Sequence, residues 1–430
     1  MIAAQSSLTW VPFHYNYPMI KLLHFADAHI DIANYGAHDP RTGLPLRVMD
    51  FLKSLDTIVD TAIEEKVDLV IFAGDAYKDR SPAPTFQREW GKRIMRLSRA
   101  KIPTILLTGN HDIAPSQQRA HAIQEFDTLE VPYVHVVYKP TLLGPNEIDG
   151  LPVQVLAIPW ITRSGVASLL ENIPADEKDP NKLIENAISD LIQTAIQALD
   201  PELPTILAAH ASIIGAVFGN EQTIKLGQDV SLPPGLVRNP HFDYVALGHI
   251  HRFQDLNLGA QPPVVYPGSI ERVDFGEVRE EKGFVIAEVS KGETHYTWRK
   301  LAIRPFLDLT VTLEKGDPVR EKLLAALPDE EAMRAAVVRL NIFYPSDMEA
   351  QIDEGALREK AHLAFDFRTS RHPRSDIRAR LGESSETERK TPEELLRMYW
   401  TNLHEDPQEQ EALIELAQQI LSSEADEAES

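Results

Sequence analysis

The chain has 430 residues, and 65 acidic against 43 basic side chains give it a formal net charge of −22 at pH 7. This length allows two or three domains with sizeable cores. The chain contains no cysteine, which excludes disulfides and thiolate metal sites and is compatible with a reducing cytoplasm. No run of about 18 apolar residues occurs, so we expect no membrane span and predict a cytoplasmic protein without a membrane partner.

The first segment, residues 1–18, contains no lysine or arginine and no apolar stretch of signal-peptide length. We therefore expect it to be an N-terminal extension that does not direct export. Met19 lies immediately before the first strongly apolar run. Residues 1–18 are therefore expected to be either a disordered extension or a misassigned start.

Five short apolar runs are predicted to form buried parallel strands: residues 20–25, 69–72, 104–107, 205–208 and 244–247. Each is followed by a polar motif. These motifs are Asp27-Ala28-His29, Gly74-Asp75, Gly109-Asn110-His111-Asp112, His210, and Gly248-His249-Ile250-His251. Because ligands of α/β sheets bind beyond the carboxyl ends of the strands, we expect all five motifs to face one crevice.

Each motif taken alone has an ordinary structural explanation. His29 or His210 could be a satisfied structural histidine, and Gly74-Asp75 could be a strand-to-loop turn. Asn110 could likewise belong to a turn, and Asp112 could cap a following helix. Five such motifs in order after five strands are not expected by chance, so together they favour a shared site.

The residue types indicate the chemistry of that site. Imidazoles mixed with carboxylates and an amide suit manganese, iron or zinc, whereas an all-oxygen site suits magnesium or calcium. We predict two divalent metal ions, manganese first, with iron, zinc or magnesium as alternatives. Two such ions about 3.5–4 Å apart can clamp a phosphate and activate a water near neutral pH. The pattern therefore predicts phosphoester hydrolysis.

The order of these motifs resembles that of the calcineurin-like metallophosphoesterases, over residues 21 to 251. The segment Val265-Tyr266-Pro267-Gly268-Ser269-Ile270-Glu271-Arg272 and the sequence beyond it are similar to the SbcD-type subunits of bacterial SbcC/SbcD double-strand-break nucleases. The resemblance implies an α/β fold, namely a four-layer α/β/β/α sandwich with a smaller α/β capping domain and C-terminal helices.

The resemblance also implies roles for the residues of the motifs. It implies that one ion is held by Asp27, His29, Asp75 and His251. It implies that the second ion is held by Asp75, Asn110, His210 and His249. Asp75 would then bridge the two ions, and His111 would be the catalytic histidine, which binds no metal. A positioned proton donor of this kind typically contributes about 10²–10⁴ in rate.

One position departs from the family pattern. Family members often carry histidine or aspartate three residues beyond the bridging aspartate, where this chain has Lys78, followed by Asp79 and Arg80. The resemblance links this position to the presentation of DNA ends, so the balance of exonuclease and endonuclease action stays open. Lys78 and Arg80 either contact phosphates or are solvated loop charges.

We expect five segments along the chain. They are an extension at 1–18, a phosphoesterase domain at 19–280, a capping domain at 281–365, a linker at 366–390 and a helical segment at 391–430. The capping domain is predicted to contain strands at 283–289, 295–301, 306–313 and 336–343, and helices at 319–327 and 354–364. By resemblance, it would select and orient DNA.

The charge is unevenly distributed. Residues 381–430 hold 14 acidic and 3 basic side chains, which supply half of the net charge. Seven basic residues instead gather before this tail: Arg358, Lys360, Arg368, Arg371, Arg374, Arg378 and Arg380. They could meet phosphate or a partner, or belong to a solvated linker.

Two helices are predicted in the last segment. They begin at Thr391-Pro392-Glu393-Glu394 and at Asp406-Pro407-Gln408-Glu409, each with a capping residue and a proline at the first helical position. The second presents an apolar stripe of Leu413, Leu416, Ala417, Ile420 and Leu421. By resemblance, this stripe packs against an SbcC-type ATPase. Docking onto its own domain is the alternative.

Taken together, these patterns favour a metal-dependent DNA nuclease with a dinuclear centre. The resemblance implies a 3′-to-5′ exonuclease on duplex ends that also nicks single strands or hairpins, works with an ATPase and could form a homodimer. One alternative is a stand-alone phosphodiesterase or phosphatase acting on nucleotides or proteins. Another is a structural scaffold without enzymatic activity, against which the intact ligand set argues.

Overall fold

The computed structural model describes residues 19–114, 120–161, 180–219 and 231–374, together with six residues nearer the C-terminus: Glu394, Leu396, Leu413, Ile414, Leu416 and Ala417. The chain divides into two compact units, Met1–Arg304 and Pro305–Ser430. Within the described residues no helix is long and apolar enough to cross a membrane.

The first sheet of unit 1 has six strands in the order β14-β13-β1-β2-β3-β4. Their bounds are β1 (Ile20–Phe25), β2 (Leu69–Phe72), β3 (Thr104–Leu107), β4 (Val134–Val137), β13 (Gly283–Ser290) and β14 (Glu293–Lys300). Strands β1 to β4 run parallel to one another, and the last two pair antiparallel at one side. The sheet therefore brings the ends of β1, β2 and β3 to one edge.

The second sheet also has six strands, in the order β11-β12-β10-β7-β6-β5. Their bounds are β5 (Thr141–Leu143), β6 (Gln154–Ile158), β7 (Thr205–His210), β10 (Tyr244–Gly248), β11 (Gln254–Asp255) and β12 (Val264–Tyr266). The four central strands are parallel. A separate short pair joins β8 (Ser212–Ile213) to β9 (Ser231–Leu232). Register places Gly248 opposite His210, so the last two polar motifs lie side by side.

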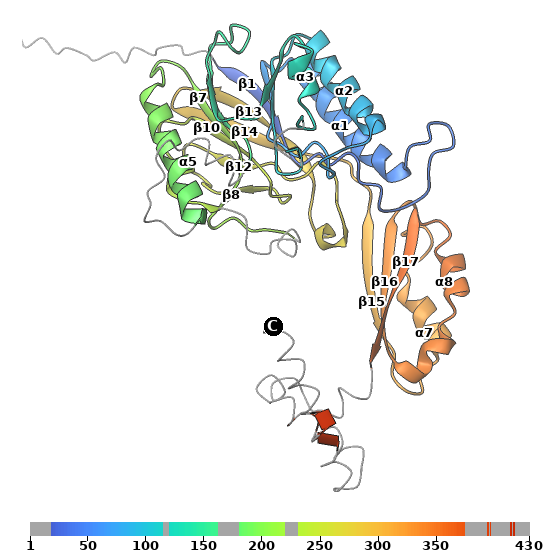
Figure 1. Ribbon diagram of the computed structural model, residues 1–430. Coiled ribbons are helices and arrows are strands. Elements are labelled where there is room, and N and C mark those ends of the chain that lie inside the picture. The colour runs from blue at the N-terminus through green and yellow to red at the C-terminus, as the bar shows by residue number, and fades with distance from the viewer. Residues whose placement is uncertain are drawn as a thin grey trace, which may run out of the picture. The chain divides into compact units, whose positions relative to one another are not determined.

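The two sheets face each other and helices cover their outer faces (Figure 1). One apolar core lies between the sheets and includes Leu22 and Ile71 from the first and Ile206 and Ala246 from the second. The helices on the first sheet are α1 (Leu46–Glu64), α2 (Pro84–Arg99) and α3 (Glu125–Thr128). On the second sheet lie α5 (Pro180–Gln197) and α6 (Pro234–Val237). This confirms the predicted four-layer α/β/β/α fold.

Unit 2 is a three-stranded parallel sheet in the order β15-β16-β17 with helices on one face. Its elements are β15 (Phe306–Thr312), α7 (Val319–Ala326), β16 (Val337–Pro345), the 3₁₀ helix η3 (Ser346–Gln351), α8 (Glu354–Lys360) and β17 (Asp366–Arg374). Its core contains Leu323, Leu340, Ile342 and Leu357, all nearly inaccessible. The sequence predicted the first two strands and both helices of this unit.

Two of the predicted boundaries are wrong. The strands expected at 283–289 and 295–301 were assigned to the capping domain, but β13 and β14 belong to the first sheet, and the first unit ends at Arg304. The reason is pairing: β13 pairs with Ile20 to His24 of β1, and its inward side chains enter the core between the sheets. An alternating pattern predicts a strand but not its neighbour.

The linker expected at 366–390 also begins too early, since β17 pairs with β16 over nine residues. From the sequence, its arginines either meet phosphate or a partner or belong to a solvated linker. Two of them pair with carboxylates of the same unit, Arg371 with Glu354 and Arg374 with Glu314, both at 2.9 Å. Residues 375–390 lie outside the described part of the chain.

The prediction of two C-terminal helices also falls mostly outside the described residues. The six residues described there all have helical backbone. Ile414 is 2% exposed, whereas Leu413 and Leu416 of the predicted stripe are 38% and 54% exposed. Large apolar side chains are therefore present at the surface of the second predicted helix.

Candidate metal centre

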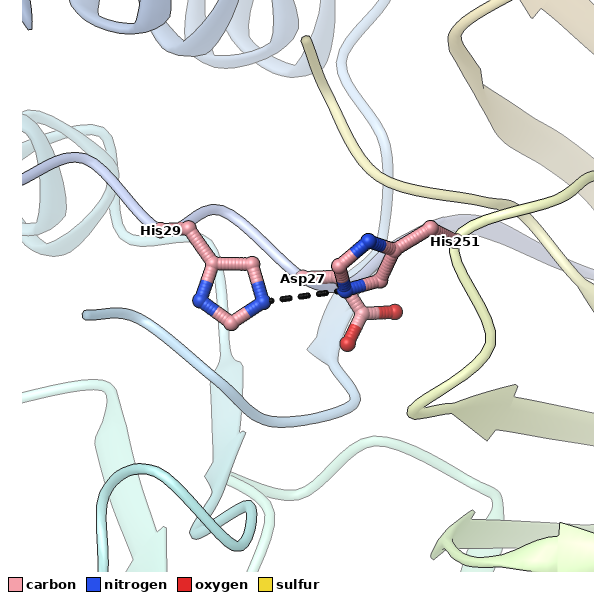
Figure 2. A group of neighbouring side chains, drawn as sticks. All are labelled: Asp27, His29 and His251. Atoms are coloured by element: carbon pink, nitrogen blue, oxygen red, sulfur yellow. Dashed lines mark hydrogen bonds between the residues drawn. The ribbon is translucent and has the colours of Figure 1, made fainter. Parts of the chain in front are cut away.

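A first group of potential ligands consists of Asp27, His29 and His251, all buried (Figure 2). Asp27 and His29 follow β1, and His251 follows β10 in the other sheet. One donor atom from each lies within 4.8 Å of the others. The Nε2 atoms of the two histidines are 3.1 Å apart, so both imidazoles point to the same place.

The tautomers of these two histidines fit a cation between them. His29 Nδ1 lies 3.2 Å from the carbonyl oxygen of Tyr77, and His251 Nδ1 lies 2.7 Å from Oε1 of Glu277. Because a carbonyl and a carboxylate only accept hydrogen bonds, each neutral ring carries its proton on Nδ1. The unprotonated Nε2 atoms of the two rings then face each other. This arrangement is favourable when one metal ion binds both nitrogens.

A second group of potential ligands consists of Asp75, His210 and His249, again with donor atoms within 4.8 Å of one another. His210 Nδ1 donates to the carbonyl oxygen of Ala73 at 2.7 Å, which leaves Nε2 as the ligand atom. Asn110 joins this group, since its Oδ1 lies 3.0 Å from both His210 Nε2 and His249 Nδ1. The amide oxygen is therefore placed as a further donor.

Asp75 lies between the two groups. Its Oδ2 is 3.4 Å from His210 Nε2 in the second group and 3.9 Å from His29 Nε2 in the first. The carboxyl is 2% exposed. It is therefore placed within reach of both groups, and the bridging role that the resemblance implies for Asp75 stays a prediction.

The glycines of the motifs permit these close approaches. A Cβ on Gly109 would lie 2.1 Å from Oδ1 of Asp75, and one on Gly248 would lie 2.1 Å from the carbonyl oxygen of Ala73. Four predicted ligands also have backbones in the left-handed region: Asp27 (φ 51), His29 (φ 39), Asp75 (φ 65) and His249 (φ 102). Such strained conformations cluster at functional sites.

Burial shifts the pKa values of side chains in the two donor groups. It raises the pKa of Asp27 to about 7. Burial favours the neutral form of His210 and by itself would lower its pKa. The negative charge of Asp75 acts in the opposite direction, and the pKa of this histidine is raised to about 9. Burial likewise favours the neutral form of Asp75, yet His210 and His111 hold its pKa below the usual range of an aspartate. Mutually perturbed groups of this kind are typical of functional sites.

Asp112 has a different role from the helix cap considered as an alternative. Its buried carboxylate accepts the backbone N–H groups of Asp75 at 2.7 Å, Ala76 at 3.0 Å and Gly109 at 2.9 Å. It thereby ties the loop after β2 to the loop after β3. These two loops carry Asp75 and Asn110.

His111 lies beside the two groups but belongs to neither. Its ring is perpendicular to that of His29, with centroids 5.2 Å apart. Nδ1 lies 2.7 Å from the carbonyl oxygen of Lys78, and the backbone N–H donates to Oδ1 of Asp75 at 2.8 Å. The proton thus belongs on Nδ1, and Nε2 is left for chemistry.

Lys78 therefore contributes its backbone to the site, which the sequence did not predict. Its loop is held by Asp31, whose carboxylate accepts the N–H groups of Lys78 at 2.6 Å and Asp79 at 3.0 Å. The side chain of Lys78 is exposed. It lines a groove together with Arg80 and His111, where it can meet a substrate.

Three residues near the site escaped the sequence analysis: Asp31, Trp160 and Glu277. The ring of Trp160 lies 5.0 Å from that of His249 and 5.9 Å from that of His210. Trp160 lies just beyond β6, in the same sheet as β7 and β10, and this position could have identified it as a residue of the site. Glu277 lies in the 3₁₀ helix η2 (Phe275–Glu277) and contacts His251, and no spacing pattern connects these two.

Residues 20–253 match the family model named calcineurin-like phosphoesterase. The chain belongs to the calcineurin-like phosphoesterase family. Proteins of this family use dinuclear metal centres, and the two neighbouring groups of donors fit such a centre. The match covers the chain from β1 to β10 and includes every predicted ligand.

The chain is also similar to two DNA double-strand break repair proteins called Mre11. It is 25% identical over 340 residues to that of Thermoplasma acidophilum, covering 77% of this chain and 79% of the relative. It is 23% identical over 338 residues to that of Methanosarcina acetivorans, covering 78% of this chain and 47% of the relative. A solved dimetal phosphatase from Danio rerio is 10% identical with a TM-score of 0.38, covering 65% of this chain and 98% of that one.

Proposed function

We propose that this protein is a two-metal DNA nuclease. The observation that carries the proposal is the pair of buried donor groups with Asp75 between them. The first ion is held by Asp27, His29, Asp75 and His251. The second ion is held by Asp75, Asn110, His210 and His249. The mixture of imidazole, carboxylate and amide donors favours manganese, with iron, zinc or magnesium as alternatives.

The chain's own residues then have distinct tasks. When bound, the two ions supply Lewis acidity to the scissile phosphate and lower the pKa of a water. His111 is the catalytic residue: in its doubly protonated form it donates Nδ1–H to the Lys78 carbonyl and gives the proton of Nε2 to the leaving oxygen, which leaves the neutral ring protonated on Nδ1. Asp75 orients this histidine through its backbone N–H. Asp31 holds the loop on which the carbonyl lies.

DNA is the substrate class best supported. The two Mre11 relatives are named for DNA double-strand break repair, and a groove beside His111 presents the exposed cations Lys78 and Arg80. We extend this to an SbcD-type activity, a 3′-to-5′ exonuclease on duplex ends that also nicks single strands. A cytoplasmic location and a homodimer remain predictions of the sequence.

A labelled duplex with free or blocked ends tests this function in the presence of manganese, magnesium or a chelator. We expect cleavage of the free-ended duplex with manganese and none with chelator. The Asp75→Ala protein, purified in the same way, controls for contaminating nucleases. A strong preference for a small chromogenic phosphodiester over DNA would instead support a stand-alone phosphodiesterase and contradict the nuclease.

The proposed partner is an SbcC-type ATPase that binds the C-terminal segment. Leu416 is 54% exposed, and Leu416→Asp would put a charge into the apolar contact, which is strongly unfavourable. We expect this variant to lose co-purification with the ATPase while keeping basal cleavage. Leu258→Asp is the matched control, because Leu258 is 82% exposed in unit 1. Undiminished complex formation by Leu416→Asp would contradict this partner surface.

A further inference from the structure

His251 differs from two other predicted histidine ligands, His29 and His210, in what its second ring nitrogen contacts. His29 and His210 each place Nδ1 on a neutral backbone carbonyl, of Tyr77 and Ala73 respectively. His251 places Nδ1 on a carboxylate, Oε1 of Glu277, at 2.7 Å. A carboxylate draws the ring proton more strongly than a carbonyl does, so the opposite nitrogen becomes a stronger metal ligand.

Glu277 is held in one orientation. Its side chain is almost entirely buried, and its other oxygen, Oε2, accepts the backbone N–H of Val273 at 2.8 Å. The same oxygen pairs with Nζ of Lys282 at 2.9 Å. Both oxygens are therefore engaged, and Oε1 stays directed at the imidazole of His251.

Lys282 contacts the same ligand from the other side. Its ammonium is fully buried and donates to Glu280 at 2.8 Å and to the backbone carbonyl oxygen of His251 at 2.9 Å. Burying a charged network is costly, and apolar residues would stabilise a core as well or better. A network that contacts both the ring and the backbone of one predicted ligand therefore indicates a role at the metal site.

We infer that Glu277 is a positioning residue for the metal ion at Asp27, His29 and His251, with Lys282 as its buried counter-charge. This inference rests on the two-metal centre proposed above. It makes the two metal positions unequal, because a charged group supports a ligand at the first and a neutral carbonyl supports His210 at the second. Loss of such a supporting group typically weakens metal binding by about 10–100-fold.

The test is Glu277→Gln, which keeps the size of the side chain and removes its charge. Manganese bound per chain is measured after equilibrium dialysis over a range of free concentrations, so the readout does not depend on catalysis. We expect one of two ions to bind about 10–100-fold more weakly and the other to bind as in the unmodified protein. Unchanged affinity for both ions would overturn the inference.

Glu271→Gln is the matched control. Glu271 is also buried, lies in the same segment, and pairs with the fully buried Arg47 at 3.3 Å. Its side chain contacts none of the predicted ligands. We expect this variant to lose thermal stability but to bind both ions normally. If it weakened manganese binding as much as Glu277→Gln, the effect would come from losing any buried carboxylate, and the inference would fail.

Two further outcomes keep the proposals distinguishable. If the unmodified protein binds fewer than two ions, the two-metal centre itself fails, whatever the variants do. If Glu277→Gln does not fold, Glu277→Asp takes its place, since it keeps the charge but shortens the reach to His251. We then expect weaker binding of one ion only, and unchanged binding of both would overturn the role of Glu277.

Discussion

The two halves of the proposed metal centre have similar candidate ligands in different surroundings. Around the first, Glu277 and Lys282 form a buried charged network behind His251. Around the second, the carbonyl of Ala73 supports His210, and the ring of Trp160 lies against this histidine. We therefore expect the supporting groups, and not only the ligands, to set the metal affinity of each position. The groups behind the ligands distinguish two positions that look alike in sequence.

Asp75→Ala should empty both proposed metal positions. Because the carboxylate lies between the two donor groups, its removal takes a ligand from both positions and releases the backbone N–H of His111. We expect loss of both ions and of hydrolysis, measured by metal analysis and by duplex cleavage. This is the largest effect that we predict.

Asp243→Ala provides its control. Asp243 is equally buried, at 3% exposure, and its carboxylate accepts the N–H groups of Thr205 and Gly292 at 2.7 and 2.6 Å, away from the predicted ligands. This variant should be less stable and still bind two ions. Retention of two ions by Asp75→Ala would contradict the assignment of the bridging ligand.

His111→Ala should separate chemistry from metal binding at both positions. This histidine belongs to neither donor group. The Lys78 carbonyl contacts its Nδ1 and not its Nε2. We expect both ions to remain and the cleavage rate at saturating DNA to fall by about 10²–10⁴. His135→Ala, which removes a half-buried histidine paired with Asp149, should leave the rate unchanged. Loss of metal from the His111 variant would place this residue among the ligands.

The sequence predicted that these candidate ligands lie together because they stand at or just beyond the ends of buried strands, which converge by the geometry of parallel sheets. That they bind metal stays a prediction. The sequence missed Glu277 and Asp31 because their partners, His251 and the Lys78 loop, are reached only through tertiary folding. The neighbours of β13 and the strand β17 itself were missed for the same reason, since sheet pairing is not encoded in the local pattern. The sequence drew attention to the charge of Lys78, whereas in the structure its backbone carbonyl contacts Nδ1 of His111, the predicted catalytic histidine.

Lys78→Ala should have the smallest effect and act on DNA alone. The backbone carbonyl that contacts His111 remains in the variant, so the metal positions and the rate at saturating DNA should not change. If the side chain contacts a phosphate, DNA binding should weaken and the slope of its salt dependence should fall by about one unit. Lys53→Ala, on the exposed side of α1, should do neither. Wild-type binding and salt dependence would make Lys78 a solvated loop charge.

The existence of two distinct metal positions is tested most directly by anomalous diffraction at the manganese absorption edge. Crystals soaked in manganese should show two peaks about 3.5–4 Å apart. One should lie between His29 and His251, the other between His210 and His249, and both within reach of Asp75. A single peak, or peaks away from these side chains, would contradict the two-metal centre.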